Sequence, residues 1–131
     1  KQLLCYHFFM RYLGIDYGER RLGLAKADSE TKIATPFKTI LNNASVLNDL
    51  AHIVKTEVIE KIIVGVPISL DGQKNDFAYK ITEFAEDLEA RTDIPVTLEN
   101  EVFSSKIASE MSEKIDESAA AIILQTHLDR L

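Results

Sequence analysis

Carboxylate side chains occur at three places in the chain where a predicted strand or helix begins or ends. Asp16 follows a short apolar run, and Glu99 and Glu101 follow a later one. Asp116 precedes an alanine-rich stretch. Three carboxylates that converge on one edge would suit Mg²⁺ or Mn²⁺, which are hard cations that prefer oxygen ligands. Two such ions can activate a water molecule and stabilise the leaving oxygen when a phosphodiester bond is cleaved.

Each of these carboxylates also has a simpler structural role open to it. Asp16 could accept hydrogen bonds from the backbone of its own turn, and the two glutamates could be solvated at a strand end. Asp116 could cap the helix that follows it. Alternation along a strand puts Glu99 and Glu101 on the same side. The sequence therefore leaves open which of the two completes a metal site.

The apolar pattern predicts a mixed sheet that can bring these positions together. Three short apolar runs with tight connections, over residues 12–15, 22–27 and 35–40, favour an antiparallel meander. Residues 61–66 (KIIVGV) and 95–98 predict two further strands. Because helical patterns separate these two strands from the meander and from each other, we expect them to be parallel neighbours.

Helices are expected between and after these strands, and Asn42 or Asn43 is the expected N-cap of the first. Their predicted positions are residues 46–58, 77–88, 107–111 and 119–128. The fold class is therefore α/β, with a mixed five-stranded sheet flanked by helices. Since the carboxyl ends of parallel strands share one edge, Asp16 and one of the glutamates should meet there.

Composition limits the class of protein. The chain of 131 residues is 46% hydrophobic and 27% charged, which is typical of one globular domain, expected over residues 10–131 with residues 1–9 as an N-terminal extension. The single cysteine, Cys5, cannot form an intramolecular bridge and predicts a reducing compartment, the cytoplasm. No apolar run approaches the roughly 18–20 residues that span a bilayer, so no membrane partner is expected. The histidines have no zinc-ligand spacing, and no P-loop or nucleophile-elbow motif is present.

The charge distribution limits how the chain could hold nucleic acid. The net charge is −6, with nine basic and seven acidic side chains in residues 1–66 but six and fourteen in residues 67–131. A protein that binds phosphate backbones usually carries a basic patch, so a nucleic-acid partner here requires local cations or bound metal. The expected nucleic-acid contacts are Arg20, Arg21, Ser69, Lys74, Ser104, Ser105 and Lys106. We expect a monomer or a homodimer.

Four segments together resemble the YqgF family, also called RuvX, over nearly all of residues 10–131. They are RYLGIDYGERRLGLA (11–25), EKIIVGVPISLDG (60–72), EVFSS (101–105) and IDESAAAIILQTHLDRL (115–131). The resemblance implies an RNase H-like fold and a metal-dependent nuclease that acts on pre-16S rRNA or on Holliday junctions. It places the family's catalytic and metal-binding carboxylates at Asp16, Glu101 and Asp116, with Mg²⁺ or Mn²⁺ as the cofactor.

The chain departs from the family pattern at several positions. Asn100 stands where the motif has Asp, and Val102 where it usually has Arg. Residues 73–75 (QKN) replace a Thr-x-Gly element, and residues 106–115 are shorter than usual and lack a basic cluster. We expect these changes to weaken substrate binding more than they affect the metal-binding carboxylates.

Three functions follow from these observations. The leading hypothesis is a two-metal endonuclease on structured RNA or branched DNA, with the processing of 16S rRNA ends favoured. The alternative is a catalytically weak or inactive module that binds nucleic acid or a ribosomal precursor, which the acidic balance favours. An ATPase of the actin-like fold is disfavoured, because its nucleotide cleft needs two domains and the chain has the length of one.

Overall fold

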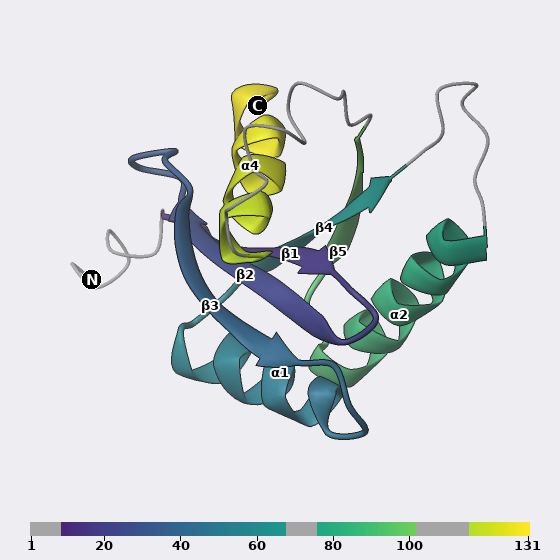
Figure 1. Cartoon of the computed structure of the whole chain (residues 1–131). Coiled ribbons are helices and arrows are strands. Elements are labelled where there is room, and N and C mark those ends of the chain that lie inside the picture. The colour runs from purple at the N-terminus through teal and green to yellow at the C-terminus, as the bar shows by residue number, and fades with distance from the viewer. Residues whose placement is uncertain (1–8, 68–75, 102–115) are drawn as a thin grey trace.

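The sheet has the predicted mixed topology (Figure 1). The computed structural model describes residues 9–67, 76–101 and 116–131, without the side chains of residues 101, 116 and 117. The strands are β1 (Arg11–Tyr17), β2 (Arg21–Asp28), β3 (Thr35–Leu41), β4 (Lys61–Pro67) and β5 (Val96–Glu101). They lie in the order β3-β2-β1-β4-β5, with β1, β2 and β3 antiparallel and β1, β4 and β5 parallel.

Helices cover both faces of the sheet. Helices α1 (Val46–Thr56) and α2 (Asp76–Thr92) pack on one face, and α4 (Asp116–Asp129) packs on the other (Figure 1). The helix expected over residues 107–111 lies outside the described residues, as do residues 1–8 and most of the loop after β4. None of the described helices is both long and apolar enough to cross a membrane.

Alternation along the strands divides the core into two apolar clusters. Leu13, Ile15 and Val64 belong to the larger cluster, on the side of α1 and α2. Tyr12 and Ile63, in the opposite phase of the same strands, belong to the smaller cluster with the underside of α4. Residues 62–66 of β4 are buried throughout, as the β-branched sequence predicted. Burial of each large aliphatic side chain contributes about 1.5–3 kcal/mol.

The expected N-cap of α1 is wrong. The cap position is Ser45, which makes no capping hydrogen bond through its side chain. Asn43 Oδ1 instead accepts hydrogen bonds from Ser45 N (3.0 Å) and Ser45 Oγ (2.8 Å), forming a turn before the helix. Asn42 Nδ2 donates to Gly18 O at 2.7 Å. Both asparagines are therefore engaged outside the helix.

Candidate active site at the sheet edge

The carboxyl ends of β1, β4 and β5 lie at one edge of the sheet. Gly14 of β1 pairs with Ile63 of β4, which pairs with Thr97 of β5. Asp16 and Glu99 lie two residues further along β1 and β5, so they fall in the same row across the sheet. Strand β4 lies between them, which puts their Cα atoms about 10 Å apart. Glu101 ends β5 opposite Pro67. The backbone thus brings Asp16 and the β5 carboxylate positions to the same edge.

Asp16 lies on the side of the sheet that α4 covers. It is half-buried and pairs with Gly23 of β2. Its strand neighbour in the same phase, Gly14, faces α4: a Cβ built at Gly14 would lie 2.8 Å from Leu124 Cβ and 3.1 Å from Ala120 O. A half-buried carboxylate beneath a helix is the kind of group that a cation would stabilise.

Helix α4 runs back along β1, so that its first residue lies toward the Asp16 end of the strand. The rings of Tyr12 and His127 are 6.4 Å apart, which places the last turn of α4 near the start of β1. Gly14 contacts the middle of the helix, at Leu124 and Ala120. Asp116 is the first residue of α4. The side chains of Asp116 and Glu101 lie outside the described part of the structure.

Glu99 is held by the end of α4. Among the described residues it is the only charged side chain that is buried, with 3% of its surface exposed. Its Oε1 lies 3.2 Å from His127 Nδ1, and its Oε2 forms an ion pair with Arg130 Nη1 at 2.6 Å. Sequence reasoning missed this cluster, although one signal was present: an acidic residue in the buried phase of β5 and two basic residues at the end of the last helix.

The turn between β1 and β2 presents Arg20 beside the Asp16 end of β1, and Arg21 follows it as the first residue of β2. Both arginines are exposed. Asn42 fixes the turn through its side chain on Gly18 O and through its backbone N–H, which donates to Arg20 O at 2.8 Å. A Cβ at Gly18 would lie 2.5 Å from Arg21 O, so this position requires glycine. The other expected nucleic-acid contacts, Ser69, Lys74, Ser104, Ser105 and Lys106, lie outside the described residues.

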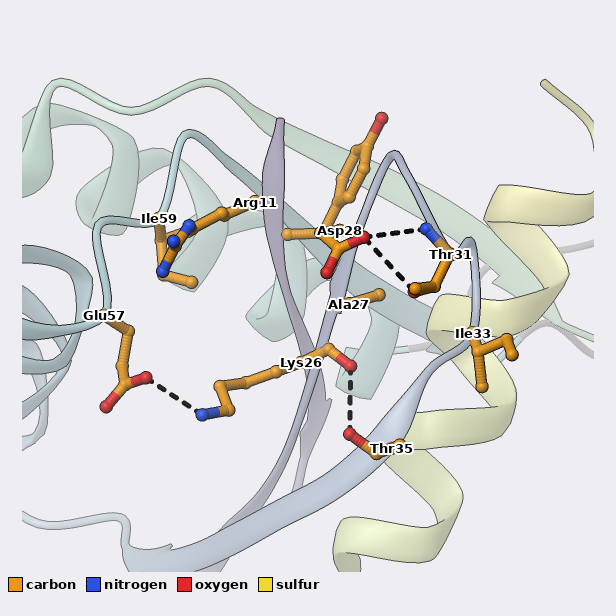
Figure 2. A pocket seen from close by; sticks show the side chains of 10 residues that line it. Arg11, Lys26, Ala27, Asp28, Thr31, Ile33, Thr35, Glu57 and Ile59 are labelled. Atoms are coloured by element: carbon orange, nitrogen blue, oxygen red, sulfur yellow. Dashed lines mark hydrogen bonds and ion pairs between the residues drawn. The ribbon is translucent and has the colours of Figure 1, made fainter. Parts of the chain in front are cut away.

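A pocket of about 490 Å³ lies at the opposite end of β1 (Figure 2). Three of its charged groups have partners, and of these Lys26 Nζ pairs with Glu57 Oε1 at 2.9 Å. Asp28 Oδ1 accepts hydrogen bonds from the backbone N–H of Thr31 (2.8 Å) and from its hydroxyl (3.2 Å). The Thr31 backbone hydrogen bond is the main reason that the pKa of Asp28 is lowered. No group of three or more metal-ligating side chains occurs among the described residues, in this pocket or elsewhere.

Comparisons with known proteins agree on one family. The family model described as RuvX, Holliday junction resolvase, matches residues 10–130. Curated proteins named "Putative pre-16S rRNA nuclease" from Sulfurihydrogenibium sp. and Syntrophus aciditrophicus are each 36% identical to this chain. The first match covers 92% of this chain and 91% of the relative, and the second covers 93% and 90%.

Two solved structures share the fold. One is Thermus thermophilus RuvC in complex with a Holliday junction substrate, with a TM-score of 0.58, 14% identity, and coverage of 92% of this chain and 94% of that one. The other is the fowlpox virus resolvase with Holliday junction DNA, with a TM-score of 0.58, 10% identity and coverage of 92% and 98%. At these identities the likeness shows the fold alone, which is RNase H-like, as the family resemblance implied.

Proposed function

Because the chain belongs to the RuvX family, whose description is Holliday junction resolvase, we propose that it is a nuclease that hydrolyses phosphodiester bonds with Mg²⁺ or Mn²⁺. The observation that carries this proposal is the sheet edge, where Asp16 and the β5 carboxylate positions share one end and α4 begins with Asp116. We take a precursor of 16S rRNA as the substrate, in line with the names of the curated relatives. A four-way DNA junction is the alternative substrate.

In this proposal Asp16, Glu101 and Asp116 hold the metal. Bound divalent ions would activate the attacking water and stabilise the leaving oxygen. The contacts of Glu99 favour Glu101 as the ligand from β5, because one Glu99 oxygen lies beside His127 Nδ1 and the other forms an ion pair with Arg130. Arg20 on the fixed turn and Arg21 at the start of β2 would hold phosphates of the substrate backbone.

The position of Asn100 bears on the choice between an active nuclease and a binding module. Asn100 lies opposite Val66 and in the other strand phase from Glu99, so it is not on the α4 side where Asp16 lies. The change from the family's Asp therefore removes no ligand from that side. The acidic balance still supports the alternative, a catalytically weak module that binds nucleic acid.

The test is a cleavage assay on two substrates, a 16S rRNA precursor and a four-way DNA junction, with Mg²⁺, Mn²⁺ or EDTA. We expect cleavage that requires metal and that falls at least about 100-fold in Asp16→Asn, since an essential electrostatic group is worth that much or more. The matched control is Asp87→Asn, which removes an exposed carboxylate from α2 on the other face. It should cleave like the wild type.

Thermal unfolding separates the nuclease from the alternative. A metal that binds only the folded state raises Tm by linkage, and Asp16→Asn should remove most of this rise. Nucleic-acid binding without cleavage, together with a Tm that metal does not change, would favour the non-catalytic module. Cleavage of the DNA junction but not of the rRNA precursor would keep the nuclease and change its substrate.

We also propose that residues 10–131 form one domain, which the family match over residues 10–130 supports. The single cysteine is compatible with the reducing cytoplasm as the place of action. A monomer and a homodimer both fit the proposal.

A further inference from the structure

The buried carboxylate of Glu99 needs an explanation beyond stability. Burial of an ion pair has a desolvation penalty that can exceed the attraction, and apolar residues of similar volume are often as stable or more so. Glu99 nonetheless lies beneath α4, with 3% of its surface exposed. Polar contacts depend on the relative orientation of the two groups, so a contact between Glu99 and the end of α4 can fix the orientation of the helix. Apolar contacts cannot do this.

The contacts of Glu99 join the strand that ends at Glu101 to the helix that begins at Asp116. One carboxylate oxygen meets His127 in the last turn of α4, and the other meets Arg130 just after it. The imidazole is itself confined by the ring of Tyr12 in β1. These two contacts limit how far the end of α4 can rotate or slide on β5, although Glu99 Oε2 forms an ion pair without a hydrogen bond.

Apart from Gln125, which accepts a hydrogen bond from Ala34 N and donates one to Lys32 O, the remaining contacts of α4 restrict its orientation little. Its underside contains Ala120, Ile123 and Leu124, small and aliphatic side chains that pack without direction. Leu124 lies against Gly14, and Asp116 is eight residues, or about 12 Å, further along the helix. A rotation of about 10° around this contact would move Asp116 by about 2 Å, whereas metal-ligand distances hold within about 0.2 Å.

We propose that Glu99 is a positioning residue: through His127 and Arg130 it sets the orientation of α4, and so the separation of Asp116 from Glu101 and Asp16. This inference rests on the proposed metal-dependent nuclease. Glu99 does not bind the metal, and its effect reaches the site through the helix.

The test measures the Mn²⁺ concentration that gives half-maximal cleavage, well below Tm, and the rate at saturating metal. Glu99→Gln keeps the size of the side chain and removes its charge, and we expect the half-saturating Mn²⁺ concentration to rise about tenfold. Arg130→Gln should shift it in the same direction by less. Since Arg130 is 66% exposed, this variant tests the link without disturbing the core.

The matched control is Glu57→Gln, which breaks the Lys26–Glu57 ion pair at the far end of the sheet. It should leave the half-saturating Mn²⁺ concentration unchanged, even if Tm falls. Glu99→Asp, which keeps the charge on a shorter side chain, should fall between the wild type and Glu99→Gln.

Two results would overturn this proposal alone, and a third would overturn the proposed function with it. If Glu99→Gln lowers Tm while the metal dependence and the rate stay at wild-type values, Glu99 serves stability alone. If Glu99→Gln abolishes the metal dependence as Asp16→Asn does, while Arg130→Gln has no effect, Glu99 is a ligand. If the wild type does not cleave, the rise of Tm with Mn²⁺ is compared across the same variants. No rise in the wild type would remove the proposed function and this inference together.

Discussion

Gly14 of β1 and Leu124 of α4 approach so closely that a methyl group on Gly14 would lie 2.8 Å from Leu124 Cβ. Real Cβ atoms do not come this near, and the same methyl would lie 3.1 Å from the backbone oxygen of Ala120. Two of the proposed metal ligands belong to these elements, Asp16 to β1 and Asp116 to α4. The packing at this glycine therefore sets how closely α4 approaches β1.

Gly14→Ala should force α4 away from the sheet. We expect the free energy of unfolding to fall by about 1–3 kcal/mol, which is the usual cost of an added methylene in a packed core, and metal-dependent cleavage to weaken with it. Urea denaturation measures the first effect. Leu124→Ala in the same variant should not restore stability, because the Cβ atom of residue 124 remains. Wild-type stability in Gly14→Ala would contradict the close approach.

Asp28 should stabilise the protein in a pH-dependent way. Its pKa is lowered below the ordinary value of 3.8, first by the hydrogen bond from the Thr31 backbone N–H, so the folded state favours the charged form. That stability is fully present above pH 3.8 and is lost as the pH falls through the lowered pKa. Asp28→Ala should reduce the free energy of unfolding by about 1 kcal/mol at pH 7. Denaturation from pH 7 to pH 2 should show that the difference in the free energy of unfolding between the wild type and Asp28→Ala becomes smaller. A difference that stays constant over this range would contradict this role of Asp28.

Asn42 should affect nucleic-acid affinity through the turn that carries Arg20. Asn42→Ala removes the 2.7 Å hydrogen bond to Gly18 O, at a cost of about 1 kcal/mol, and loosens the turn. We expect the Kd for nucleic acid to rise severalfold. Asn43→Ala is the matched control, because it breaks the neighbouring turn at Ser45 and should lower stability without a change in Kd. Equal values of Kd for the two variants would exclude this role of Asn42.

Binding to nucleic acid should depend only moderately on salt. The slope of log affinity against log salt is about −0.9 for each duplex phosphate neutralised, and two to four contacts give a slope shallower than about −4. Arg20→Ala should reduce the slope by about one and weaken all sequences equally, since phosphate contacts carry no sequence information. Lys55→Ala on α1 is the control that should change neither. A steeper slope in the wild type would mean that more cations contact the nucleic acid than the two to four assumed.

The apolar pattern predicted the sheet better than it predicted the contacts at the site. The run KIIVGV marked β4 because burial on both faces favours β-branched residues throughout. Strand β5 extends to Glu101, beyond the predicted end at Leu98, because pairing with β4 continues to Pro67 although Glu and Asn are poor strand formers.

Local sequence patterns could not predict the contacts of Glu99 with His127 and Arg130. Glu99 and His127 are 28 residues apart and meet only through the packing of α4 on β5. The asparagines before α1 show the same limit on a smaller scale. Their side chains have the chemistry of a cap, but the partner of Asn42 is Gly18, in the turn after β1. Spacing along the chain identifies candidates, and tertiary packing decides their partners.

The position of α4 on the sheet has a consequence for how the chain folds. Strands β1, β2 and β3 pair with strands that are adjacent to them in the sequence. The contacts of α4 instead join residues that are far apart in the chain, such as the hydrogen bond from Ala34 N to Gln125 Oε1 across 91 residues. Contacts that close long loops form slowly, because the entropy of closure is lost before they are made. We expect the meander to be ordered in the folding transition state and α4 to dock afterwards. Leu124→Ala should therefore speed unfolding and leave the folding rate nearly unchanged, a partition that stopped-flow kinetics measures.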